Sequence, residues 1–217
     1  MIDTEPLHAR AWQQAALHFG TDLESNQLIQ LQGRRRLENA RLVCSWIEQP
    51  ITADQLLAVR QPIAEQLLPE AKAMDGAESL VRTAERLGIA TALVTSSDRA
   101  SVRNKIVNHP WVNRLQLMIC GDHPDLKAGK PAPDPFQLGA DGLKVKAEEC
   151  WAFEDSRAGC VSALAAGCLV WRLLKKTDNA DQMNPGEDEL RHSDRLLPIS
   201  QLSEAQRCLE SFVSRDD

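Results

Sequence analysis

The chain has 217 residues, 43% of them hydrophobic, which is enough for one large domain or for one domain with an insertion. A formal net charge of −6 without a basic block argues against nucleic acid or an anionic membrane as a partner. The six cysteines form no C-x-x-C pair, which argues against a zinc site or a disulfide framework. No apolar run is long enough to span a membrane, and the first residues lack the apolar stretch of a signal peptide, so we expect a cytoplasmic protein. We also expect a monomer.

The first third of the chain is helical in pattern. Apolar residues recur at helical spacing, no strand pattern occurs before residue 88, and Thr52 is a candidate N-cap. Helices are predicted over 8–18, 27–31, 36–47 and 54–68. We therefore expect residues 5–72 to form an all-helical domain. Residues 1–4 and 73–217 would form the other domain, with chain crossings near 3–5 and 69–75.

Beyond residue 75, helix and strand patterns alternate. Short apolar runs bounded by glycine or polar residues predict strands over 89–95, 115–120, 150–153, 168–173 and 196–199. Helices are predicted over 75–87, 97–107, 133–143, 156–166 and 203–213. Strands that alternate with helices indicate a doubly wound parallel α/β sheet of the Rossmann-like type.

The stretch 150–159 predicts a buried strand that ends in two acids, Glu154 and Asp155, and turns into a helix. The carboxyl ends of the strands are where open α/β sheets bind ligands. Two adjacent carboxylates suit Mg²⁺, which prefers oxygen ligands and usually takes only one or two carboxylates. The alternative is structural: Asp155 is simply the N-cap of the helix, and Glu154 is a solvated neighbour.

Two further stretches carry candidate residues. Thr95, Ser96 and Ser97 end a predicted strand, where a hydroxyl and the N–H groups of a helix start can hold an anion, or can serve as an ordinary helix cap. Lys130 lies among prolines that fix the backbone and so aim the lysine, although most loop lysines are solvated surface. Hydroxyls, lysine and acids along one sheet edge would surround a phosphate and its Mg²⁺.

Taken together, the segments VTSS, GKPAPDPF and FEDSRAG resemble the later motifs of the haloacid dehalogenase superfamily of phosphotransferases. The opening DTEPLHARAW resembles the branch of that superfamily with a helical cap, which includes β-phosphoglucomutase and sugar-phosphate phosphatases. The resemblance covers essentially the whole chain, and it implies that 5–72 is the cap. It also implies that Thr95 binds a phosphoryl oxygen and that Lys130 neutralises the nucleophile and the phosphate. Asp155 with Glu154 would hold Mg²⁺.

The resemblance further assigns candidate residues in the helical segment. Thr4 and His8 match positions near the cap hinge. The loop from Gly33 to Arg36 matches the cap loop that meets the substrate, and Arg36 falls where an arginine reads a second phosphate. Arg60 is a weaker candidate for the same role. The alternative for the arginine run is a solvated turn.

One departure from the superfamily outweighs the matches. Its nucleophile is the first aspartate of a D-x-D-G-[TV] motif, which ends the first, central strand just upstream of the residues that match DTEPLH. That strand and both aspartates are absent here, and Asp3 cannot replace them because it matches a later position. Either the gene start was placed at an internal methionine, or this is a true short form. We favour the first interpretation, because the other motifs are all present.

The sequence therefore predicts a Mg²⁺-dependent phosphatase that acts on a small phosphorylated metabolite, a sugar or polyol phosphate, through a phosphoaspartate. The nucleophile would lie upstream of Met1, so the chain as written would be inactive. A β-phosphoglucomutase with the same site is the first alternative. The second is a truncated, non-catalytic binding protein of the same fold.

Overall fold

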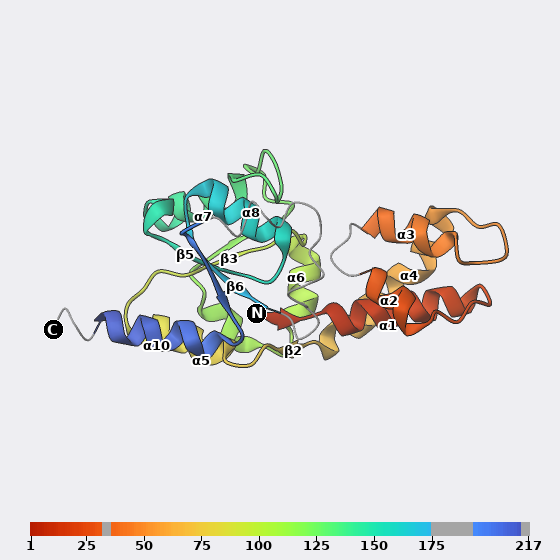
Figure 1. Cartoon of the computed structure of the whole chain (residues 1–217), viewed down its shortest axis with the longest axis horizontal. Helices are drawn as coiled ribbons and strands as arrows, with labels where there is room; N and C mark the ends of the chain where they lie inside the picture. Colours follow the sequence, from red (N-terminus) through yellow and green to blue (C-terminus); the bar gives the residue numbers. More distant parts are fainter. Residues whose placement is uncertain (32–35, 175–192, 214–217) are drawn as a thin grey trace. The chain divides into compact units, whose positions relative to one another are not determined.

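The computed structural model describes residues 1–31, 36–174 and 193–213 (Figure 1). The chain divides into two compact units. One unit consists of Met1–Met74 and Arg103–His109, and the other of Asp75–Val102 and Pro110–Asp217.

The first unit is built mainly from helices, as the sequence pattern predicts. Its elements are α1 (Glu5–His18), α2 (Ser25–Gln30), α3 (Arg36–Cys44), α4 (Ala53–Leu67) and a 3₁₀ turn η1 (Leu68–Glu70). Thr52 caps α4 as expected: its hydroxyl accepts from the backbone N–H of Gln55 at 3.2 Å, and the Gln55 side chain accepts from the Thr52 N–H at 2.8 Å. Helix α1 begins before the predicted residue 8, since Pro6 is well tolerated in a first turn.

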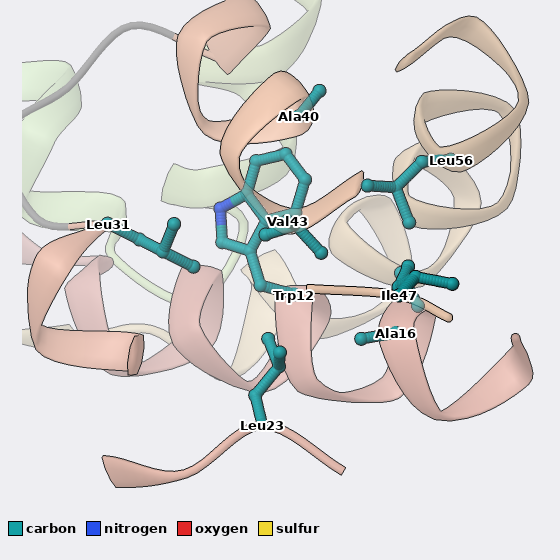
Figure 2. Packing of buried hydrophobic residues seen from close by; sticks show 9 residues of the cluster. Trp12, Ala16, Leu23, Leu31, Ala40, Val43, Ile47 and Leu56 are labelled. Atoms are coloured by element: carbon teal, nitrogen blue, oxygen red, sulfur yellow. The ribbon is translucent and has the colours of Figure 1, made fainter. Parts of the chain in front are cut away.

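The helices of the first unit pack around one tryptophan. Figure 2 shows Trp12 of α1 surrounded by apolar side chains from the other helices and from the segment that follows α1. Trp12 is 3% exposed, and Val43 and Leu56 are completely buried. The remaining members of this cluster are Ala15, Ala16, Leu23, Leu31, Ala40 and Ile47. The helical segment thus has a hydrophobic core of its own.

Two features of the first unit were not predicted. Strand β1 (Ile2–Asp3) pairs antiparallel with β2 (Lys72–Ala73), so the expectation of no strand before residue 88 was wrong. Two-residue strands are too short to show the alternation of apolar and polar residues by which strands are recognised. The segment 103–109 also belongs to this unit. Its side chains bond to carbonyl groups at the end of α4 and beyond: Asn104 to Glu65 at 2.7 Å, Asn108 to Pro69 at 2.8 Å and His109 to Ala71 at 2.6 Å.

The second unit alternates helices and parallel strands, so the predicted fold class is confirmed. The strands are β3 (Ala92–Val94), β4 (Leu117–Ile119), β5 (Trp151–Glu154), β6 (Leu169–Leu173) and β7 (Leu196–Ile199). The helices are α5 (Ala77–Arg86), α6 (Arg99–Ile106, which ends in the first unit), α7 (Asp134–Leu143), α8 (Arg157–Ala166) and α10 (Leu202–Val213), with 3₁₀ turns η2 (Pro110–Arg114) and η3 (Ala147–Glu149). Each strand lies within or beside its predicted range. Gly167 ends α8 in the left-handed conformation, with φ of 98°.

The parallel strands form two separate sheets. One sheet pairs β3 with β4, and the other has the order β5-β6-β7. Within the described residues, no strand pairs with β3 on its other side or with β5 on its other side. The Thr95 N–H donates to Ile119 in β4 at 2.9 Å, and because backbone groups alternate along a strand, the carbonyl of Val94 points to the unpaired side. Both sheets therefore keep an open edge.

Candidate active site

The centre of the candidate site is a buried ion pair. Lys130 Nζ contacts the carboxylate oxygen Oε1 of Glu154, the last residue of β5. The two side chains are only 9% and 8% exposed. Nζ also donates to the carbonyl of Val94 at 3.1 Å and lies 4.9 Å from the centre of the Phe136 ring. The lysine thus touches the open edge of β3 and the carboxyl end of β5.

The second oxygen of Glu154 is held by the start of α8. The hydroxyl of Ser156 donates to Glu154 Oε2 at 3.2 Å and accepts from the backbone N–H of Gly159 at 3.1 Å. A Cβ on Gly159 would lie 2.0 Å from that same oxygen, so only glycine leaves room for the carboxylate. Burial, and then the charge of Glu154, raises the pKa of Cys160 to about 12, so this thiol stays protonated and is no nucleophile.

The loop after β3 is shaped by short backbone contacts. The hydroxyl of Thr95 accepts from the Ser97 N–H at 3.1 Å, and the Ser97 carbonyl accepts from the Gly121 N–H at 2.8 Å. A Cβ on Gly121 would lie 2.3 Å from the Ser96 carbonyl oxygen. Thr95 therefore stabilises its own turn, whereas the side chain that caps the start of α6 is Asp98, which accepts from the Ser101 N–H at 2.7 Å. The phosphoryl-binding role of Thr95 stays a prediction.

The first unit contains a second buried cation. Arg60 is 5% exposed, and its Nη2 lies 3.0 Å from His8 Nδ1. Its guanidinium carbon lies 4.5 Å from the centre of the Trp12 ring, and its Nε is buried without a hydrogen-bond partner in the part of the chain that the structure describes. Burial, and then the charge of Arg36, lowers the pKa of Arg60 to about 10, so the side chain remains charged at neutral pH.

His8 beside Arg60 is neutral. Burial, and then the charges of Arg60 and Lys105, lowers its pKa to about 4. Since the arginine has no acceptor function, Nδ1 of His8 accepts the hydrogen bond from Arg60.

The remaining candidates in the helical unit lie at its ends and surface. Thr4 is the N-cap of α1 without a side-chain cap bond, and its carbonyl accepts from the His8 N–H at 3.0 Å. Arg36 is exposed and donates to Gln61 at 3.2 Å. Gly33 lies outside the described residues.

Comparison with known proteins identifies the family. The sequence model of the haloacid dehalogenase-like hydrolases matches residues 1–167. The chain belongs to this family. It is 31% identical over 175 residues to Hexitol phosphatase A of Escherichia coli, a match that covers 78% of this chain and 76% of the relative. The family is one of hydrolases and this relative is named a phosphatase, so the prediction of an enzyme of this family is confirmed.

Two further comparisons bear on length and fold. The chain is 26% identical over 171 residues to the Bifunctional riboflavin kinase/FMN phosphatase of Arabidopsis thaliana, and it spans less than half of that relative, 45% of its length. The β-phosphoglucomutase of Clostridium difficile has a TM-score of 0.67 at 18% identity, with 99% of this chain and 94% of that chain covered. At this identity the structural likeness concerns the fold alone.

Haloacid dehalogenase-like phosphatases typically use a divalent metal ion. No group of three or more histidine, cysteine, aspartate or glutamate side chains suited to a metal occurs in the described part of this hydrolase. Mg²⁺ needs fewer, because it keeps several waters and binds through one or two carboxylates. Asp155 is partly exposed and directly follows β5. Its predicted role as a metal ligand stays a prediction. None of the described helices is both long and apolar enough to cross a membrane.

Sequence reasoning missed the residues that hold the ion pair. The structural alternative for the two acids was wrong: the N-cap of α8 is Ser156 and not Asp155, and Glu154 is buried and not solvated. The hydrogen bond from Ser156 to Glu154 had no sequence signal. Phe136, whose ring lies under the lysine, carried only an apolar helix signal. The contact of Lys130 with the Val94 carbonyl could not be predicted from the sequence, because every residue carries a backbone carbonyl.

Proposed function

We propose that this chain is the greater part of a Mg²⁺-dependent phosphatase that acts on a small phosphorylated metabolite, a sugar or polyol phosphate. The observation that carries the proposal is the buried Lys130–Glu154 pair, where a fixed cation reaches the open edge of β3 and the carboxyl end of β5. The similarity to Hexitol phosphatase A supports the polyol phosphate class.

The residues of the second unit would then have separate tasks. Lys130 would neutralise negative charge on the nucleophile and on the phosphoryl group, and Thr95 with Ser96 and Ser97 would bind phosphoryl oxygens. Asp155 would hold Mg²⁺, which when bound polarises a phosphoryl oxygen and offsets its charge. A positioned cation and hydroxyl donors supply most of what phosphoryl transfer needs.

The nucleophile would be an aspartate on a strand that pairs with both open edges. Such a strand would use the unpaired backbone groups of β3 and β5, which are costly to bury unpaired. An aspartate at its carboxyl end would reach the region of Lys130. Its carboxylate would attack phosphorus with loss of the alcohol, and water would then cleave the acyl phosphate. The 217-residue chain by itself would be inactive.

We further propose that residues 5–72 are the cap and select the substrate. Arg60 is charged and buried without a carboxylate within ion-pair distance among the described residues, so it suits an anionic group of a ligand. His8 supports it as a neutral acceptor. Arg36, Thr4 and the Gly33 loop would contribute as the sequence resemblance implies.

Phosphate release tests the proposal. We would compare the 217-residue chain with a longer chain that begins with a strand carrying D-x-D-G-V, on hexitol phosphates with and without Mg²⁺. We expect release only from the longer chain and only with Mg²⁺. Lys130→Ala and Asp155→Ala in the longer chain should each lower kcat by about a hundredfold or more. Equal turnover by both chains would place the nucleophile elsewhere and overturn the proposal.

A further inference from the structure

We propose that Cys150 and Cys168 form a reversible disulfide when the protein meets a small-molecule disulfide oxidant, so that the starts of β5 and β6 carry a thiol modification site. Both cysteines are free thiols in the structure. Spacing along the chain gave no sign of this pair, because a strand and a helix separate its members. The proposal rests on the fold of the second unit and not on the proposed phosphatase function.

The register of the sheet places the two cysteines side by side. In the parallel pair of β5 and β6, Trp151 lies opposite Leu169. One residue earlier on each strand, the same register sets Cys150 opposite Cys168, and the Leu169 N–H donates to the Cys150 carbonyl at 2.9 Å. Neighbouring strands lie about 4.8 Å apart. A disulfide spans about 4.4 to 6.8 Å between Cα atoms, so the strand spacing suits this bond.

The side chains of the two cysteines share one face of the sheet. Because side chains alternate along a strand, Cys150 lies on the same face as Ala152, and Cys168 on the same face as Val170. Ala152, Cys168 and Val170 belong to one buried cluster, and Cys150 packs against it. The two thiols are close enough for the charge of a Cys150 thiolate to raise the pKa of Cys168.

Both cysteines lie just before the paired part of their strands. Cys150 ends the turn η3, where its N–H donates to the Ala147 carbonyl at 3.0 Å. Cys168 follows Gly167, which ends α8 with φ of 98°. The paired residues of β5 and β6 begin at the next position on each strand. Small backbone adjustments that close the bond would therefore leave the ladder between the strands in place.

Different access to solvent sets the order of the reaction. Cys150 is partly exposed, and its thiol donates to the Lys146 carbonyl at 3.3 Å, whereas Cys168 is only 2% exposed. The Cys150 thiolate would attack oxidised glutathione, form a mixed disulfide and release one glutathione. Cys168 would then attack the Cys150 sulfur and release the second glutathione. Each protein sulfur loses one electron, and the oxidant is reduced to two thiols that take up the two cysteine protons.

The surroundings of the pair make this reaction slow at neutral pH. Burial, and then the charges of Glu149 and Glu148, raises the pKa of Cys150. Burial, and then Cys150, raises the pKa of Cys168 to about 11, and the charge of Arg195 opposes that rise. Since the thiolate is the nucleophile, the rate should increase about tenfold per pH unit near neutrality. The site therefore suits sustained oxidation.

Peptide mass spectrometry tests the pairing directly. The reduced 217-residue chain is incubated with oxidised glutathione at pH 8.5, and the remaining thiols are blocked by alkylation. In the wild type we expect one bond, from Cys150 to Cys168 within a single chain. Fragmentation distinguishes Cys168 from Cys160, which lies in the same tryptic peptide. The double variant Cys44→Ser with Cys208→Ser is the matched control and should form the same bond.

Two single variants separate the steps. Cys168→Ala should accumulate the glutathione adduct on Cys150, which the wild type passes through, and Cys150→Ser should leave the buried Cys168 reduced. Cys150→Ser changes a partly exposed position, so it still decides the matter if Cys168→Ala fails to fold. The bond closes a loop in the unfolded chain, so the oxidised wild type should unfold at a urea concentration about 1 M higher than the reduced one. Cys150→Ser should show no such shift.

The inference is overturned if the wild type stops at a glutathione adduct of Cys150, or if Cys150 bonds to Cys160 or to a second chain. It is also overturned if both cysteines stay reduced at pH 8.5 while the exposed Cys208 reacts. Absence of phosphatase activity in the longer chain would reject the proposed function alone, since the disulfide is read without any turnover.

Discussion

The two units each bury a cation, and they treat it in opposite ways. Lys130 in the second unit is paired with Glu154, and both side chains are less than one-tenth exposed. Arg60 in the first unit is 5% exposed, contacts the neutral His8 and the Trp12 ring, and has no ion pair with any described carboxylate. Burying an isolated charge costs free energy. Contacts with polar groups and aromatic rings, or a counter-ion supplied by a ligand, offset that cost.

The difference separates two kinds of functional charge. A cation with its own counter-ion is held in a fixed place and has little net charge to attract a ligand over distance. A cation without a counter-ion still attracts an anionic ligand. We therefore expect Lys130 to act by its position and Arg60 to act by its charge, and the following experiments test that distinction.

The largest effect is expected from Lys130→Met. It removes one partner of a buried pair and leaves the Glu154 carboxylate uncompensated, which typically costs about 3 to 5 kcal/mol of stability. The double change Lys130→Met with Glu154→Gln should recover much of that loss, because no buried charge remains. Urea unfolding of the four chains of this cycle measures the coupling. If the losses of unfolding free energy in the two single variants simply add up in the double variant, Lys130 and Glu154 do not stabilise the fold through their interaction.

A pH effect should come from His8. Its pKa of about 4 in the folded chain lies below the ordinary 6.5, so between these values the unfolded chain binds more protons. The stabilisation is fully present above pH 6.5 and is lost as the pH falls toward 4, by up to about 1.4 kcal/mol per pH unit.

The measurement is the free energy of unfolding from pH 4.5 to 7.5 for the wild type and for His8→Gln. Glutamine can still accept the hydrogen bond from Arg60 but does not titrate. The difference between the two curves should therefore rise as the pH falls below 6.5. Parallel curves would mean that His8 is not held neutral beside Arg60.

The sequence predicted the elements better than their contacts. The predicted strands of the second unit were found because glycines or polar residues bound their apolar runs. Gly167, for example, ends α8 shortly before β6 begins at Leu169. The prolines around Lys130 correctly indicated an aimed lysine. Which acid the lysine would meet could not be predicted, because Glu154 and Asp155 are neighbours in sequence and only the folded chain shows that Lys130 contacts Glu154.

The strand that the superfamily resemblance places at the centre of the sheet is absent from the sequence, and the described parallel strands form separate β3-β4 and β5-β6-β7 sheets. The burial of Arg60 could not be predicted from the sequence. Its position in α4 follows from helical periodicity, but its contact with His8 joins residues that lie 52 positions apart. Such contacts depend on how helices pack, which a local pattern does not specify.

Arg60→Met should have a smaller effect on stability than Lys130→Met. Methionine keeps the packing against Trp12 and removes an uncompensated charge, so the change in the free energy of unfolding should stay within about 1 kcal/mol. Inorganic phosphate should raise the Tm of the wild type by more than that of Arg60→Met, in which the proposed phosphoryl site around Thr95 and Lys130 is intact. The exposed Arg10→Met is the control that should retain the full phosphate effect. If Arg60→Met retains the full effect as well, Arg60 is a structural cation.

The smallest effect is expected at an ion pair with good geometry and no burial. Arg10 lies 2.8 Å from Glu70, but their side chains are 51% and 55% exposed. Water and salt screen such a pair, and holding two long side chains together costs rotamer entropy, so its net contribution should be below about 1 kcal/mol. We would measure urea unfolding of Arg10→Ala, Glu70→Ala and the double variant at low and high salt. A coupling energy near zero that is insensitive to salt would show that burial, rather than contact distance, determines how much the Lys130–Glu154 pair contributes to stability. A coupling as large as that of Lys130 with Glu154 would remove the basis for treating the buried cations as a distinct class.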